Sequence, residues 1–236
     1  MILSERLKAS LSAAEANFIS ISLASTFLNT SNTTSYSFTN QSIGAAPSAG
    51  ERRFIVVIVG DTNNVSGVSW SGNTNEVTFG GSNADAILAY QNSPSGNESG
   101  VICAIKEMPT GTTMTLGVDP DITCLGVGGG VYRVITGSAG YAVRGTGTST
   151  DASSPVITLS TAAQADDVAV SCISNVNGGN YSWPAGWTKD YEVDPQSTEN
   201  TAGAHITFTG TVSSVTISQT DNGDTGASLV VALYPA

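Results

Sequence analysis

The stretch that decides the fold is RFIVVIV at residues 53–59, which Gly60 and Asp61 close. Six consecutive residues after Arg53 are apolar, and five of these six are β-branched. A run of this length and composition predicts a central β-strand that is buried on both faces. About a dozen further short apolar runs follow at near-regular spacing, separated by turn-forming clusters such as GGSN at residues 80–83. The pattern predicts an all-β protein, a jelly roll or β-sandwich of two antiparallel sheets.

Two similar sequence segments leave open whether the chain contains an internal duplication. SAGERRFIVVIV at residues 48–59 and AQADDVAVSCI at residues 163–173 each lead from a small polar turn into an apolar strand. They are compatible with a weak internal duplication, or with the turn-to-strand pattern that recurs in any β-sandwich. The polar stretch TGTSTDASSP at residues 146–155 is the best linker candidate. Because neither half clearly supplies two full sheets, we favour one continuous domain over residues 17–236.

The N-terminal segment differs from the rest of the chain. Leu3, Leu7, Leu11 and Phe18 follow one another at helical spacing, so they predict one stripe of a short amphipathic helix. Such a stripe must be covered by another surface. We therefore interpret residues 1–16 as a helical anchor that binds a partner through this stripe.

Charge and hydropathy exclude several classes of protein. The chain of 236 residues holds 8 basic and 19 acidic residues, a net charge of -11, which disfavours binding to nucleic acid. No apolar stretch approaches the roughly 20 residues that span a bilayer, so we expect no membrane segment. The first residues lack the positive and apolar regions of a signal peptide, so we expect synthesis in the cytoplasm without export.

Candidates for chemistry are few. His205 is the one histidine of the chain and falls on a predicted strand, and no G-x-S-x-G motif accompanies it, so we expect a structural role and no catalytic residue. Cys103, Cys124 and Cys172 are odd in number and widely spaced, which predicts buried free thiols and no zinc site. Glycines 126 and 128–130 precede a strand rather than a helix, which argues against a nucleotide loop. We expect no cofactor.

One loop and one aromatic cluster leave alternatives open. Residues 221–224 (DNGD) combine oxygen ligands suited to calcium with the Asn-Gly pair of a hairpin turn. Tyr181, Trp183, Trp187 and Tyr191 lie close together in the sequence NYSWPAGWTKDY. Such rings stack on sugars when they are exposed, and pin a loop to a sandwich when they are buried.

Several phrases of the chain together resemble a family of uncharacterised structural proteins of tailed phages and prophages. They are SYSFTNQSIGAAPSAGERRFIVVIVG (35–60), MPTGTTMTLGV (108–118), SPVITLSTAAQADDVAVSCI (154–173), WPAGWTKDYEV (183–193) and SLVVALYPA (228–236). The resemblance implies a jelly-roll, concanavalin-like domain in a virion, as a head decoration, fibre or tail component whose partners are other capsid or tail proteins. It brings no catalytic residues to carry over.

From these observations we expect a non-enzymatic virion protein that is attached through its N-terminal segment. Uncharged predicted strands such as residues 212–219 are weakly protected against pairing, so we also expect a homo-oligomer, with a trimer as the favoured state. The alternative is a carbohydrate-binding sandwich that adheres to a host-surface glycan through its aromatic cluster.

Overall fold

The computed structural model describes residues 17–63, 67–94, 99–150, 154–176, 179–196, 199–219 and 226–236. This part of the chain consists of antiparallel β-strands and contains no helix, which confirms the expected all-β class. Leu3, Leu7, Leu11 and the rest of the expected anchor lie outside the described residues. Phe18 is half-buried directly before the first strand.

The strands have the following bounds: β1 (Ile19–Asn29), β2 (Tyr36–Ser42), β3 (Arg52–Thr62), β4 (Val77–Phe79), β5 (Ser82–Asn83), β6 (Ala86–Asn92), β7 (Ser99–Glu107), β8 (Thr113–Val118), β9 (Gly126–Thr136), β10 (Tyr141–Ser149), β11 (Val156–Ala163), β12 (Val168–Val176), β13 (Tyr181–Ser182), β14 (Thr188–Gln196), β15 (Glu199–Thr207), β16 (Val212–Thr216), β17 (Ser218–Gln219) and β18 (Gly226–Pro235).

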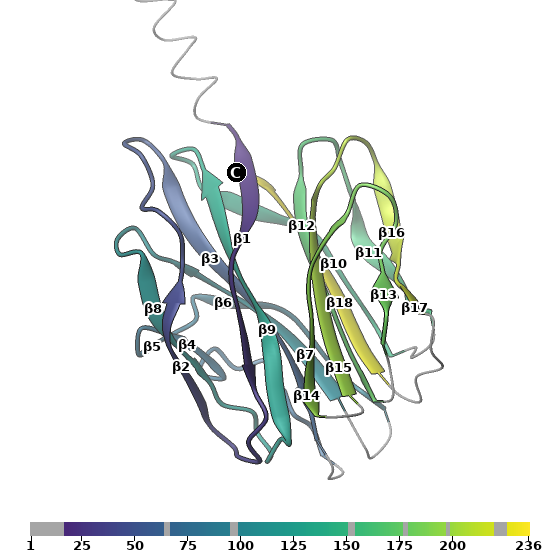
Figure 1. Ribbon diagram of the computed structural model, residues 1–236. Helices are drawn as coiled ribbons and strands as arrows, with labels where there is room; N and C mark the ends of the chain where they lie inside the picture. Colours follow the sequence, from purple (N-terminus) through teal and green to yellow (C-terminus); the bar gives the residue numbers. More distant parts are fainter. Residues whose placement is uncertain are drawn as a thin grey trace, which may run out of the picture.

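The strands form four layers rather than the single pair of sheets that the sequence predicts (Figure 1). Two five-stranded sheets, β1-β9-β3-β7-β6 and β10-β18-β12-β15-β14, lie face to face in the middle. The outer layer of the first half is the sheet β2-β8-β4-β5, and that of the second half consists of the pairs β11-β16 and β13-β17. The protein is therefore two β-sandwiches packed back to back.

The two sandwiches repeat one strand order. Reading each inner sheet from its first strand, β1, β9, β3, β7 and β6 correspond in turn to β10, β18, β12, β15 and β14. The strands β6 and β14 each contain one extra, bulged residue at the equivalent place, Leu88 and Asp190. Cys103 and Gly203, which lie opposite the residue after each bulge, fix the alignment of the other strands. Of the two interpretations of the paired phrases, this order favours the duplication.

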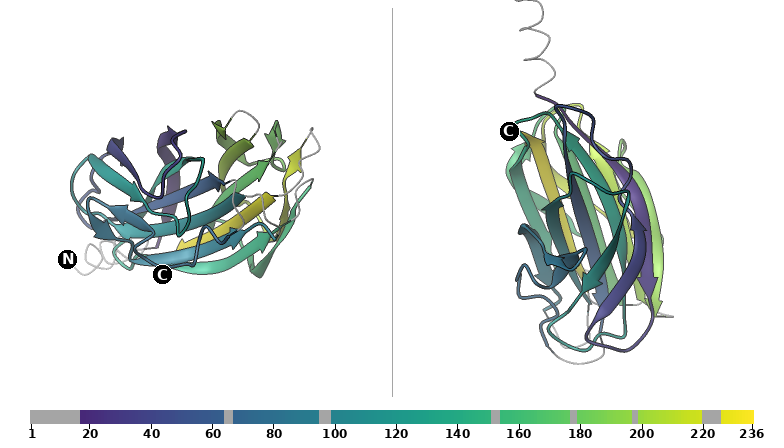
Figure 2. Two further views of the ribbon diagram at one scale, coloured as in Figure 1. Left: turned by 90° about the horizontal axis from the view of Figure 1, so that it is seen from below. Right: turned by 90° about the vertical axis from the view of Figure 1, so that its left-hand side faces the viewer.

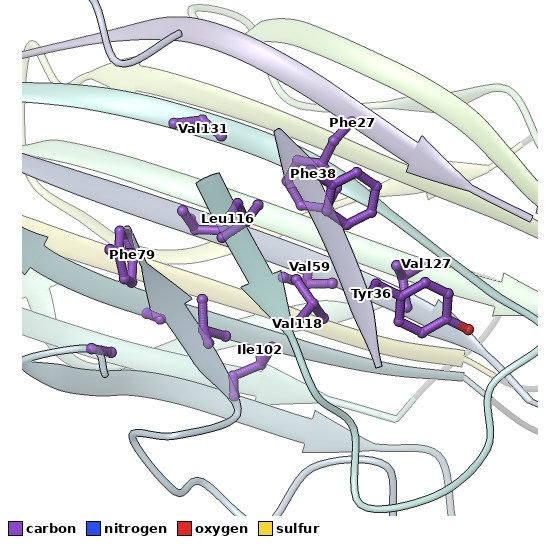
Figure 3. Close-up of a cluster of buried hydrophobic side chains, with 14 of the residues drawn as sticks. Phe27, Tyr36, Phe38, Val59, Phe79, Ile102, Leu116, Val118, Val127 and Val131 are labelled. Atoms are coloured by element: carbon purple, nitrogen blue, oxygen red, sulfur yellow. The ribbon is translucent and has the colours of Figure 1, made fainter. Parts of the chain in front are cut away.

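The central strand β3 explains why residues 53–59 are apolar throughout. Ile55, Val57 and Val59 point into a core between the first inner and outer sheets, whereas residues 54, 56 and 58 point into the core between the two inner sheets. Figure 3 shows the rings of Phe27 and Phe38 side by side in the first of these cores. Their centroids are 4.7 Å apart. A third core fills the second sandwich. The expected burial of β3 on both faces is confirmed.

Candidate functional site

The aromatic residues that the sequence groups together do not form one platform. Tyr181 is 2% exposed in the core of the second sandwich, and Tyr191 is 6% exposed on the opposite face of its sheet, in the core between the halves. Trp183 and Trp187 are half-buried beside the core of the second sandwich. Only these two indoles have surface that a ligand could touch without displacing a core side chain.

The two indoles flank an exposed turn at residues 184–186, and each contacts a residue of the second sandwich. The Nε1–H group of Trp183 donates to Oγ of Ser171 at 2.9 Å. The ring of Trp187 meets Phe208 edge to face at 6.0 Å between centroids. Gly186, with φ of +95°, supplies the left-handed residue that the turn requires. Each indole is thus held by a contact with the second sandwich and keeps part of its surface accessible.

His205 lies beside the interface between the halves, where it binds a carboxylate. Its Nδ1 is 2.8 Å from both oxygens of Asp190, whose side chain is 4% exposed. The ring also meets Tyr132 of the first sandwich at 6.1 Å between centroids. Burial and the neighbouring Asp190 raise the pKa of Tyr132 well above its ordinary value. Within the described residues, no hydroxyl or thiol group forms a hydrogen bond with the ring of His205.

Asp61 is a fully buried carboxylate that sequence reasoning did not single out. Its Oδ1 accepts a hydrogen bond from Nε1 of Trp70 at 2.7 Å, and its Oδ2 accepts from Ser69 at 2.7 Å and from the thiol of Cys124 at 3.3 Å. Burial raises the pKa of Asp61 to about 6, and these hydrogen bonds oppose the shift. The backbone oxygen of Asp61 accepts from Ser174 of the second sandwich, so this network also crosses the interface.

Arg53 is a second buried charge that the sequence did not reveal. Its guanidinium donates to five backbone oxygens, and its side chain is completely buried. The acceptors belong to two loops of the first sandwich and are Gly44, Ala45, Met108, Thr110 and Gly111. The signal in the sequence was an arginine directly before the most apolar run of the chain. Its neighbour Arg52, by contrast, lies at the surface. Arg53 holds loops together and leaves no donor for a ligand.

The remaining candidates are structural or lie outside the described residues. Cys103, Cys124 and Cys172 are buried free thiols, as expected, and burial raises the pKa of each. The loop Asp221-Asn222-Gly223-Asp224, weighed for calcium, falls among residues that the structure does not describe. Across the described ranges, no group of three or more histidine, cysteine or carboxylate side chains is arranged to hold a metal. No helix in that part of the chain is long and apolar enough to cross a bilayer.

The glycine run in β9 makes room for large rings. A Cβ atom at Gly129 would lie 2.0 Å from the backbone oxygen of Ile58 and 2.6 Å from the ring of Phe27. A Cβ atom at Gly130 would lie 2.8 Å from the ring of Tyr191. These glycines therefore serve the packing of both cores.

In comparisons with known proteins, no protein-family model, no curated protein and no solved structure matches the chain. The arrangement itself defines the protein as an all-β chain of two packed sandwiches. The likeness to phage structural proteins remains a prediction from the phrases of the sequence.

Proposed function

We propose that this protein is a non-enzymatic structural component of a phage particle, exposed on its surface as a head decoration, fibre or tail component. It is attached through its N-terminal segment to other capsid or tail proteins, and it forms a homo-oligomer. Production in the host cytoplasm and incorporation into the virion follow from this role.

The observation that supports attachment at one end of the molecule is the position of Phe18 and Ala236. The backbone oxygen of Phe18 accepts a hydrogen bond from Gly137 at 3.2 Å, and the final residue, Ala236, donates to Gly140 at 3.1 Å. The start of β1 and the end of β18 thus lie at one end of the molecule (Figures 1 and 2). A protein that is attached at this end projects the loops of the opposite end outward.

We further assign each sandwich to the jelly-roll class. In the first half, the strands of the inner and outer sheets alternate along the chain, with β1, β3, β7 and β9 in one sheet and β2, β4, β5 and β8 in the other. The first and last strands are neighbours in the inner sheet. This alternation with a closing neighbour pair is the connectivity of two joined Greek keys. The additional strand β6 extends the inner sheet.

The test of attachment is removal of residues 1–16. The truncated and the full chains would be produced in lysates of the strain that carries the gene, and particles would be separated on a density gradient. We expect the full chain to sediment with the particles and the truncated chain to remain folded, by circular dichroism, but free. Normal incorporation of the truncated chain would show that the anchor lies elsewhere, and absence of the full chain from particles would refute the proposed role.

A carbohydrate-binding function is the second candidate, and the half-buried indoles of Trp183 and Trp187 favour it. Exposed indole faces stack on apolar faces of sugars, and two rings on either side of a turn can grip neighbouring residues of a glycan. Tyr181 and Tyr191 take no part, because both are buried. Glycan-array binding that is lost in Trp187→Ala and kept in the exposed control Thr158→Ala would support this function. A full array without signal would remove it.

A further inference from the structure

The outermost strand of the first inner sheet, β1, has a free edge. It pairs with β9 on one side, and no strand of the described chain pairs with its other side. Along an antiparallel edge strand, alternate residues direct their N–H and C=O groups away from the sheet. Such a row of unpaired groups recognises another extended strand.

The equivalent edge strand of the second sandwich, β10, is covered by another strand of the same chain, β11. The strand β11 packs so tightly on β10 that a Cβ atom at Gly145 would lie 2.3 Å from the backbone oxygen of Thr161. The N–H group of Thr146 donates to Ser160 at 3.1 Å. In the first sandwich, the hydrogen bonds that we see between β2 and β1 are confined to Ser25. β2 therefore leaves most of the edge of β1 open.

The charge pattern indicates the occupant. Between Glu15 and Glu51 the sequence contains no acidic or basic residue, although the chain carries a net charge of -11. In contrast, the edge strand β14 is protected by two bulges and by four charged residues and a proline, which are Lys189, Asp190, Glu192, Asp194 and Pro195. Two copies of an anionic protein repel each other least where each presents a neutral edge.

The surface of β1 has the polarity of a strand-pairing edge rather than of a lipid contact. Ser20, Ser22 and Thr26 are exposed, and Leu28 is 44% exposed. The nearest charge on β9 is Arg133, opposite Ser22, and its guanidinium is bound to the backbone oxygen of Ala45. The edge thus offers backbone groups, hydroxyls and one apolar side chain to a partner.

We infer that β1 pairs with β1 of a second copy of this chain, antiparallel and across a twofold axis. The pairing joins the inner sheets of the two copies into one continuous sheet, with the same surface used on both sides of an isologous interface. The inference rests on the homo-oligomer of the proposed function, to which it assigns an interface, and it gives a dimer instead of the trimer that we expect from the sequence. It does not depend on attachment to a particle.

The test compares three full-length proteins by sedimentation velocity over a concentration series. The edge variant is Ser20→Lys/Thr26→Lys, and the matched control is Ser213→Lys/Ser214→Lys, which places the same charges on exposed positions of β16. We expect the wild type and the control to dimerise alike, and the edge variant to dissociate at least about tenfold more readily. Hydrogen exchange of the β1 amides in the wild type is expected to slow as the dimer forms.

Several outcomes would overturn the inference. They are a wild type that is monomeric throughout the series, an edge variant that associates as well as the wild type, and a control that dissociates while the edge variant does not. A trimer whose β1 amides stay unprotected also contradicts it. Particle association is measured separately, so loss of the dimer with retained sedimentation on particles would refute this interface and leave the attachment proposal standing.

Discussion

The two sandwiches share a strand order, but they differ in the residues that occupy equivalent buried or half-buried positions. Leu88 and Ile105 of the first half correspond to Asp190 and His205 of the second. Asp61, three residues after Ile58 in β3, corresponds to Asn175 in β12. The strand order is the same in both halves although one has an apolar pair and the other a polar pair at these positions. The topology therefore does not depend on which kind of pair is present.

The two halves also differ in the charged side chain at the start of the central strand of each inner sheet. Arg53 in the first half binds five backbone oxygens from two loops and is completely buried. The equivalent residue of the second half is Asp167, which binds Arg144 through both carboxylate oxygens and accepts from the N–H group of Gln164. Arg144 is 28% exposed, so water can replace part of this contact.

The largest effect is therefore expected from Arg53→Met. Methionine fills much of the volume but removes the donors of five backbone oxygens, and a hydrogen bond to a charged group contributes about 1.5–3 kcal/mol. We expect the free energy of unfolding to fall by more than about 3 kcal/mol, because several groups are affected at once. Urea denaturation followed by tryptophan fluorescence and circular dichroism measures the change.

The matched control is Asp167→Asn in the second half. Asparagine keeps one oxygen for Gln164 and Arg144, so we expect a loss of only about 1 kcal/mol at this partly exposed pair. Equal losses in the two variants would mean that the two halves are fastened alike and that the difference drawn from the structure is wrong.

The sequence predicted the burial of β3 on both faces but not that of its counterpart β12, for an identifiable reason. Residues 53–59 are continuously apolar, so burial on both faces was evident. The equivalent strand β12 contains Ser171, which suggests a solvated face. Ser171 is buried all the same, because the indole of Trp183 donates to its hydroxyl. A contact between residues on different strands cannot be derived from the periodicity of one strand.

The aromatic cluster shows the same limit at the candidate site. A strict alternation places Trp187 and Tyr191 on one face of a strand, because they are four residues apart. The bulge at Asp190 reverses the alternation, so Tyr191 enters the core between the halves while Trp187 stays at the surface of the second sandwich. A bulge is a local deviation in pairing that the residue pattern alone does not reveal. The sequence alone therefore could not show that Tyr191 is buried while Trp187 lies at the surface.

A pH effect is the second expected difference between the halves, through Asp61. Its pKa in the folded protein is about 6, above the ordinary value of 3.8, so the native state binds the proton more tightly than the unfolded chain. The stability that Asp61 contributes is then greatest below about pH 4 and is lost as the pH rises through about 6. The difference corresponds to about 3 kcal/mol.

Replacing Asp61 with asparagine, the residue of the second half, isolates this effect. Unfolding free energies of the wild type and Asp61→Asn would be measured from about pH 4 to about pH 7.5. We expect the wild type to lose stability relative to the variant across this window. A constant difference between the two proteins would show that the carboxyl titrates at its ordinary pKa.

A smaller effect is expected where Tyr191 fills the space between the halves. A Cβ atom at Gly203 would lie 2.4 Å from the ring of Tyr191, so Gly203→Ala forces the ring to move, at a cost of about 1–3 kcal/mol. Combining it with Tyr191→Leu removes the clash. We expect the double variant to be more stable than the sum of the two single losses predicts, as a double-mutant cycle measures. Additive losses would place the strain elsewhere.

An effect of the same order is expected at the polar pair that distinguishes the two sides of the interface. His205→Asn removes the ring that binds the buried carboxylate of Asp190, and we expect a loss of about 1–3 kcal/mol with no hydrolytic activity to lose. His205→Ile/Asp190→Leu places the residues of the first half at both positions, and replacing both partners of a hydrogen bond by apolar groups of similar shape can be nearly neutral. We therefore expect the double variant to be more stable than His205→Asn in thermal denaturation. If the double variant is instead the less stable of the two, the pair is needed where it stands, and the two halves are not interchangeable at this position.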